Sequence, residues 1–397
     1  MRRWVGPGIL VAVGYMDPGN WATGIEAGSG YGYALAWVIV VSSLAAILLQ
    51  ILAARLGLWG GTDLVGLGYR FFGRRIGGFL AFTAFVAVTA TDLAEVLGFA
   101  LALRLLLGVP MAIGAILALV EVVLVLYWSA RRPRLLEKLV GALTLAIVAI
   151  FVYELMLLRP SPQAVLAGLI PSAQPFRDPE ALYLMLGLIG ATIMPHNLYL
   201  HSSWVAQQER APSHQQTSAF LTQDTIRSLG LALFVNLALL ITAATLRGTP
   251  DPAHRWDIAE AYRLFEPAVG AWAGIAFGIA LLLSGHNATL TSTLTGQFVL
   301  GYLLPQRIAP ELRAFLLRSS SLLPALLVLL LWGEGEVGAL LVLSQVILSL
   351  QLPFVLGPML YFLFRLPEAR TGRLSLSLAY AISLLITGLN LYLLWRL

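Results

Sequence analysis

Two short stretches of the sequence place polar side chains beside helix-breaking residues inside long apolar runs. The first, Asp17-Pro18-Gly19-Asn20, lies in the middle of the run 4–27, which is long enough to cross a bilayer as a helix. Proline removes a helical hydrogen bond and glycine loosens the backbone, so we expect the helix to break there. Broken backbone at this depth is tolerated only where protein or a water-filled cavity satisfies it. An acidic side chain at such a break predicts a cation site.

The second break is predicted in the stretch 191–197, Ala-Thr-Ile-Met-Pro-His-Asn, within the apolar run 182–205. Two interrupted spans in corresponding positions of two halves are the best sequence indication of a secondary transporter's binding site. The breaks together offer the carboxylate of Asp17, the amide oxygen of Asn20 and exposed backbone carbonyls, of which that of Ala191 is favoured.

Met194 adds a thioether to these oxygen donors. Soft sulfur favours late first-row divalent ions and Cd²⁺ over Mg²⁺ and Ca²⁺, which prefer all-oxygen ligands. The alternative is that Met194 is a flexible apolar filler, which is the usual role of a methionine in a core. With both breaks present, we interpret the set as a transition-metal site.

Asp92 and Glu95 are spaced i, i+3 in another apolar run, so they share one face of a helix. Two carboxyls so close in an apolar span cannot both stay ionised cheaply, which favours a proton-carrying role. Arg318 could pair with these acids and drive proton release, or it could be a snorkelling arginine at a helix end. His196 titrates in a useful range but could equally cap the broken backbone, and His201 is expected to be structural.

Four further polar residues lie in apolar runs. Glu121 is isolated in the sequence and is expected to form a buried pair with an arginine that the sequence does not identify. Asn236, His286 and Asn287 are expected to form hydrogen bonds between helices.

Composition places these residues in a helical membrane protein. Of the 397 residues, 59% are hydrophobic and only 11% are charged, which no soluble globular domain matches. The basic residues lie in short connections between apolar runs, so the net charge of +5 does not indicate nucleic-acid binding. Cysteine is absent, which excludes disulfides and thiolate metal ligands.

Eleven transmembrane helices are expected from apolar runs of about 20 residues. After the first, they are 33–56, 76–107, 111–128, 135–158, the broken 182–205, 226–246, 267–304, 314–332, 337–364 and 374–394. With the N-terminus in the cytoplasm, 17 basic residues fall in inner connections and six in outer ones, so we expect that orientation and an external C-terminus.

The first and sixth spans then run in opposite directions. We therefore expect a single transmembrane domain, 1–397, built from inverted five-helix repeats of about 4–158 and 180–364, followed by an eleventh helix at about 374–396. The first span is read as retained and not as a signal peptide, because it holds two polar residues and lacks a clear cleavage site.

The two breaks resemble the signature pair of the Nramp family of divalent metal–proton symporters. Agreement extends over nearly the whole chain, from about Gly6 to the eleventh span, and includes the stretches 91–95, 198–202 and 344–346. The resemblance implies an all-α LeuT-type fold with broken helices 1 and 6. It also implies metal binding by Asp17, Asn20, the Ala191 carbonyl and Met194, joined in the occluded state by Gln345.

The same resemblance implies a route for protons. Asp17 would take part in proton binding, and Asp92, Glu95 and Arg318 would form the exit network, with His196 as a further candidate. Many family members carry an acid where this chain has Phe85. We expect proton transport to persist, while the tightness of its coupling to metal is not specified by the sequence.

The function expected is import of Mn²⁺ or Fe²⁺ with protons by alternating access, with Cd²⁺ and Co²⁺ also carried. No cofactor is expected, and the partners are metal ions, protons and the lipid bilayer, with no nucleic acid. We expect a monomer in a bacterial inner membrane.

Three alternatives are weighed against this function. An amino acid transporter or a Mg²⁺-type relative would keep the fold and change the substrate. An intramembrane enzyme is disfavoured, because no His-Glu-x-x-His, Gly-x-Ser-x-Gly or phosphate-loop pattern occurs. A passive channel would leave the two inverted broken helices unexplained.

Overall fold

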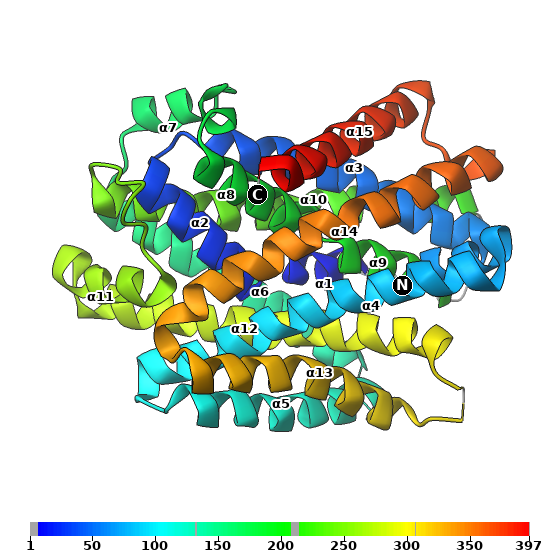
Figure 1. Cartoon of the computed structure of the whole chain (residues 1–397), viewed down its shortest axis with the longest axis horizontal. Helices are drawn as coiled ribbons and strands as arrows, with labels where there is room; N and C mark the ends of the chain where they lie inside the picture. The colour runs from blue at the N-terminus through cyan, green and yellow to red at the C-terminus, as the bar shows by residue number, and fades with distance from the viewer. Residues whose placement is uncertain (1–6, 132, 208–213, 306, 397) are drawn as a thin grey trace.

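The computed structural model describes residues 7–131, 133–207, 214–305 and 307–396, and the regular elements in these ranges are helices. Most of the long helices run side by side along the longest axis of the molecule, and the short α7 and α11 lie at one end (Figure 1). The helices are α1 (Pro7–Gly14), α2 (Pro18–Tyr31), α3 (Ala36–Gly60), α4 (Leu64–Leu107), α5 (Met111–Arg131), α6 (Pro133–Leu158), α7 (Pro162–Gly168), α8 (Pro179–Ile193), α9 (Pro195–Gln207), α10 (His214–Arg247), α11 (Ile258–Val269), α12 (Ala271–Leu303), α13 (Pro310–Leu331), α14 (Val337–Arg365) and α15 (Arg373–Arg396).

Both predicted helix breaks are present. The first separates α1 from α2, where Asp17 is the N-cap and Pro18 starts the new helix, as proline is suited to do. The second separates α8 from α9 at Met194, whose φ of 36° lies outside the helical region. Pro195 then starts α9. The all-α fold with interrupted first and sixth spans is therefore confirmed.

Eight helices of the described part are long and apolar enough to cross a membrane, and two shorter apolar helices lie within α5 and α13. The count of eleven spans stays a prediction. Among the basic residues used for orientation, Arg2, Arg3, Arg132 and Arg210 lie outside the described residues.

Two helices begin well before their predicted starts. The third span was expected from residue 76, but α4 begins at Leu64 and is kinked at Gly73, where φ is 76°. The seventh was expected from residue 226, but α10 begins at His214. Hydropathy marks only the part of a helix that lies in hydrocarbon, whereas backbone hydrogen bonding continues through polar turns beyond it.

The interrupted helices lie in the middle of the bundle (Figure 1). α2 packs on α10, α8 packs on α14, and α12 lies along α4. Trp21, directly after the first break, is fully buried, with ring centroids 5.1 Å from Phe151 and 5.0 Å from Phe277. These contacts fix the position of the first break against α6 and α12.

Candidate metal-binding and proton-transfer site

The first break is held open by side chains that satisfy its backbone. The carbonyl of Tyr15 accepts hydrogen bonds from the Asn20 amide at 2.6 Å and from the Asn236 amide at 2.9 Å. The carbonyl of Met16 accepts from the Trp21 indole at 3.2 Å and from the Ser284 hydroxyl. Because these groups replace the helical bonds, the unwound backbone is stable at membrane depth.

Asp17 and Asn20 each keep one oxygen free. Asp17 Oδ1 accepts from the Asn20 backbone N–H at 2.8 Å, which is an N-cap bond for α2. Asp17 Oδ2 and Asn20 Oδ1 are buried and have no hydrogen-bond partner. Unpaired buried oxygens are costly, so a cation placed between them would be stabilised.

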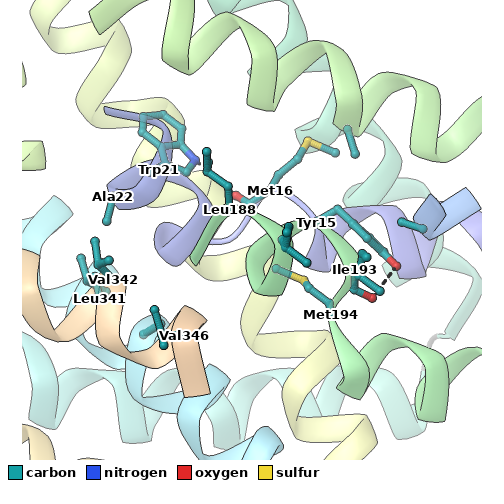
Figure 2. Packing of buried hydrophobic residues seen from close by; sticks show 14 of the residues in the cluster. Tyr15, Met16, Trp21, Ala22, Leu188, Ile193, Met194, Leu341, Val342 and Val346 are labelled. Carbon is teal, nitrogen blue, oxygen red and sulfur yellow. Dashed lines mark hydrogen bonds between the residues drawn. The ribbon is translucent and has the colours of Figure 1, made fainter. Parts of the chain in front are cut away.

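At the second break, the backbone carbonyl of Ala191 lacks its usual helical hydrogen-bond donor. In a helix the carbonyl of Ala191 would accept from the N–H of residue 195, but that residue is proline and has none. The last regular helical bond before the break runs from the backbone N–H of Met194 to Gly190 O at 3.1 Å. Figure 2 shows Met194 next to Ile193, whose carbonyl accepts a hydrogen bond from the Tyr15 hydroxyl at 3.4 Å. The two breaks therefore touch.

Gln345 reaches the same place because glycine lets α14 approach both broken helices. A Cβ on Gly19 would overlap the Gln345 side-chain amide, and a Cβ on Gly190 would overlap the Gln345 carbonyl and lie 2.7 Å from the Ser349 nitrogen. The side-chain oxygen of Gln345 is buried without a partner. The structure thus brings this residue of the tenth predicted span against the first and second breaks.

The donors at the breaks make a mixed set of one carboxylate, two amide oxygens, a backbone carbonyl and a thioether. Asp17, Met194 and Gln345 are each 0% exposed, so bulk water does not reach them in this conformation. In the described part of the chain, no group of three or more His, Cys, Asp or Glu side chains is placed to hold a metal. A metal at the breaks would therefore bind hard oxygens and one soft sulfur, a combination suited to late first-row ions and Cd²⁺.

The predicted acid pair lies in α4 and contacts an arginine. Arg318 Nη1 is 2.5 Å from Asp92 Oδ1 and 3.7 Å from Glu95 Oε2. Arg318 is only 1% exposed and lies within α13, so it is neither a snorkelling side chain nor part of a connection between spans. Its charge offsets that of the buried acids, whose ionised forms would otherwise be strongly disfavoured.

Three hydroxyl groups that the sequence did not single out complete this cluster. The Ser292 hydroxyl in α12 lies within hydrogen-bond distance of both Asp92 and Glu95 and can donate to either, and Ser321 in α13 donates to Asp92. Thr289 accepts from Arg318 Nη2 at 3.1 Å. The i, i+3 spacing of Thr289 and Ser292 in an apolar run was an available signal, but hydroxyls also bond their own helix backbone in many spans.

The two histidines of α9 have different surroundings. His196 Nδ1 lies 2.9 Å from the hydroxyl of Thr91, the residue before Asp92, and its Nε2 is buried without a partner. His201 Nδ1 lies 2.9 Å from Gln50 Oε1, and the Gln50 amide donates to the Tyr15 hydroxyl at 2.8 Å. His196 therefore brings the start of α9 into contact with α4, one residue before Asp92.

Two expectations about the remaining polar residues were wrong. Glu121 pairs with His286, whose Nδ1 lies 2.7 Å from Glu121 Oε1, and not with an arginine. Asn287 is buried with no hydrogen-bond partner for either amide atom, so it forms no bond between helices. Asn236 and His286 do bond across helices, as predicted. Phe85, at the position where many family members carry an acid, packs against the hydrophobic core.

A family profile and a similar known protein both match almost the whole chain. The family profile described as natural resistance-associated macrophage protein-like matches residues 8–396. The chain is 44% identical over 413 residues to the divalent metal cation transporter MntH of Ralstonia nicotianae, covering 100% of this chain and 91% of that protein.

Solved structures agree at the level of the fold. The manganese transporter of Eremococcus coleocola, crystallised with an aromatic bis-isothiourea compound, matches with a TM-score of 0.83 and 33% identity, covering 98% of this chain and 85% of that one. MhsT in complex with L-phenylalanine matches with a TM-score of 0.62 at 15% identity over 98% of this chain and 100% of that one, a likeness of fold alone.

Proposed function

Because this chain belongs to the natural resistance-associated macrophage protein-like (Nramp) family, we propose that it imports Mn²⁺ and Fe²⁺ together with protons. It is a multi-pass membrane transporter of divalent metal cations and not an enzyme. Cd²⁺ and Co²⁺ are proposed as further substrates, since both accept a mixed oxygen and sulfur shell.

One observation carries the proposal of a metal site. Two helix breaks that are far apart in the sequence meet, and among the described residues one oxygen each of Asp17, Asn20 and Gln345 is buried there without a hydrogen-bond partner. We assign Asp17 as the charged ligand, with Asn20 and the Ala191 carbonyl as neutral oxygen ligands. Met194 supplies the sulfur and Gln345 an amide oxygen from α14. A single carboxylate leaves the 2+ ion only partly neutralised, which suits a site that must release it.

Protons are assigned to the groups beside this site. Asp17 is proposed to bind a proton or the metal, since one carboxylate stabilises either. Glu95 and Asp92 then receive protons, and Arg318 favours their release because it stabilises the ionised carboxylates. His196 lies between the break and Thr91, which supports a place in the same route.

The proposed transport mechanism, alternating access, is based on the expected inverted repeats that contain the two broken helices. We propose that 1–397 is one domain of two inverted repeats, 4–158 and 180–364, with the helix 374–396 outside them. The first and sixth spans, which contain the breaks, rock against the remaining helices, so that the site opens first to the outside and then to the inside. We place the protein in a bacterial inner membrane as a monomer, with the N-terminus in the cytoplasm and the C-terminus outside.

The alternative substrates are disfavoured by the same donors. An amino acid would need a partner for its carboxylate, but the group at the first break is itself a carboxylate, Asp17. The likeness to MhsT is one of fold and does not extend to its ligand. The sulfur of Met194 would be a poor ligand in a Mg²⁺ carrier, because Mg²⁺ prefers oxygen ligands and water.

Uptake of metal ions into proteoliposomes tests the proposal. Purified protein would be reconstituted, and entry of Mn²⁺, Cd²⁺, Mg²⁺ and Ca²⁺ followed for the wild type and Met194→Ala. We expect the wild type to carry Mn²⁺ and Cd²⁺ and to exclude Mg²⁺ and Ca²⁺, whereas the variant loses discrimination against Ca²⁺. Equal entry of Mg²⁺ into wild-type vesicles would show that Met194 has only a packing role. Entry of an amino acid but of no metal would contradict the proposed function and leave only the assignment of the fold.

A further inference from the structure

Asn197 lies between the two helix breaks and contacts the sulfur of Met194. Its Nδ2 donates a hydrogen bond to Met194 Sδ at 3.4 Å, and its backbone N–H donates to the Met194 carbonyl at 3.2 Å. Asn197 is 0% exposed, and its Oδ1 has no hydrogen-bond partner. The side-chain amide is thus held within the site and its only hydrogen bond goes to the sulfur.

The position of this amide is fixed from the other side by α1. Its last residue, Gly14, faces Asn197 so closely that a Cβ there would overlap Nδ2 and lie 2.8 Å from Oδ1. Asn197 is therefore wedged between the end of α1 and the turn that closes α8. Because both backbones confine it, the amide cannot move away from the sulfur without a shift of one helix break.

A methionine side chain needs such a constraint to act as a selective ligand. It has three rotatable bonds and adapts easily to different surroundings, so a free thioether would pay a conformational cost on binding an ion. Thioether sulfur is a weak acceptor with two lone pairs. One pair can accept the Asn197 hydrogen bond while the other remains for a metal.

We propose that Asn197 is a positioning residue that sets the metal selectivity of the site by holding Met194 Sδ toward the ion. This inference rests on the proposed function, in which Met194 is a ligand. Only soft ions bind sulfur strongly, so the hydrogen bond from Asn197 to Met194 Sδ should raise the affinity for Cd²⁺ more than that for Mn²⁺. Figure 2 shows the side chain of Met194 near Tyr15, which lies at the first break.

Affinity measurements on purified full-length protein test this assignment. Isothermal titration calorimetry would give the Kd of Cd²⁺ and of Mn²⁺ for the wild type and for Asn197→Leu, which keeps a similar size but has no donor. We expect the preference for Cd²⁺ over Mn²⁺ to fall by roughly twofold to tenfold, the range for freeing one flexible side chain. If Asn197→Leu does not fold, Asn197→Ala replaces it.

The matched control is Asn236→Leu. Asn236 is also buried, also has a free Oδ1 and also donates one bond to the break, but to Tyr15 O and not to Met194. This variant should leave the ratio of the two affinities unchanged, even if both affinities fall. In a Met194→Ala background, Asn197→Leu should change the ratio no further.

Four results would overturn the inference. Cd²⁺ and Mn²⁺ affinities could fall by the same factor in Asn197→Leu, which a merely structural role predicts. The ratio could shift equally with and without Met194. The ratio could also stay constant in Asn197→Leu while Met194→Ala lowers it, which would leave the proposed function intact. If Met194→Ala itself leaves the ratio unchanged, the ligand role of Met194 fails, and the role of Asn197 fails with it.

Discussion

At the scale of single residues, the site depends on groups that are buried without a full set of partners. Asp17, Asn20 and Gln345 each keep an oxygen unpaired, which a folded chain tolerates where function requires it. The acid cluster differs because the guanidinium of Arg318 is bonded to Asp92 and close to Glu95, although Glu95 Oε1 and Arg318 Nε also lack a partner among the described residues. The acids therefore have a cationic partner within the protein, whereas the oxygens at the breaks do not.

Removal of Arg318 should therefore be costly. Arg318→Met leaves two buried carboxyls without a positive partner, and breaking a buried pair from one side commonly costs about 3–5 kcal/mol. We expect a marked fall in the melting temperature in detergent, partly restored by Asp92→Asn in the same chain, as a double-mutant cycle would show.

Arg104→Met is the matched control, because Arg104 pairs with Glu334 at a site where the two side chains are 42% and 36% exposed. Exposed pairs contribute about 0–1 kcal/mol, so this variant should melt close to the wild type. Equal melting temperatures for Arg318→Met and Arg104→Met would contradict the assignment of a tight buried cluster.

At the scale of elements, the approach of α14 to the broken helices assembles the site. The backbone of Gln345 and Ser349 occupies the space that a side chain on Gly190 would need. Backbone atoms inside a packed helix cannot move aside as a flexible side chain can. α14 therefore carries Gln345 to the breaks only because residue 190 of α8 is glycine.

Gly190→Ala should push α14 away and weaken metal binding. Overpacking of this kind costs about 1–3 kcal/mol in a well-packed interior, so we expect lower thermal stability together with a weaker Cd²⁺ affinity by calorimetry. Gly230→Ala in α10 is the control, since a Cβ there meets nothing within 4 Å. Wild-type Cd²⁺ affinity in Gly190→Ala would show that α14 does not contribute to the site.

A second element-scale contact involves Asp63, which caps α4 in the turn after α3. Its Oδ1 accepts from the Gly66 N–H at 2.7 Å, and its Oδ2 accepts from the Tyr302 hydroxyl at 3.2 Å. Burial raises the pKa of the Asp63 carboxyl, and these hydrogen bonds offset the rise only in part. The folded chain thus favours the protonated form more than the unfolded chain does.

The sign of the pH effect follows from that raised pKa. The stabilising contribution of Asp63 is complete below the ordinary aspartate pKa of about 3.9 and is lost as the pH rises through the raised value. Asp63→Asn keeps an oxygen for the cap but cannot ionise, so its melting temperature should fall less between acidic and neutral pH. Parallel pH profiles for the variant and the wild type would contradict this.

At the scale of the whole molecule, the sequence predicts the parts that depend on local chemistry. Proline and glycine beside Asp17 and Met194 specify the breaks, and the missing N–H of Pro195 identifies the free carbonyl of Ala191. Long apolar runs predict the spans. These features need no knowledge of which helices are neighbours, so they can be read from the chain alone.

Contacts between helices could not be predicted in the same way. The partner of Glu121 is His286, and the hydroxyl of Ser292 reaches two acids in α4, because of how α12 packs on its neighbours. The bond from Asn197 to Met194 spans one turn of chain, but it depends on Gly14 of α1 to confine it. Such pairings are set by tertiary packing, which residue type and spacing do not specify.

The central claim, that the Asp17 carboxylate at the first break serves both the metal and the proton, is tested most directly by following both ions at once. Proteoliposomes would receive an inward Mn²⁺ gradient, with Mn²⁺ entry and lumen pH recorded together for the wild type and Asp17→Asn. We predict that Mn²⁺ entry acidifies the lumen and that Asp17→Asn abolishes both signals, because one carboxylate serves both ions. Entry of Mn²⁺ without a change of lumen pH, or wild-type rates in Asp17→Asn, would contradict the account.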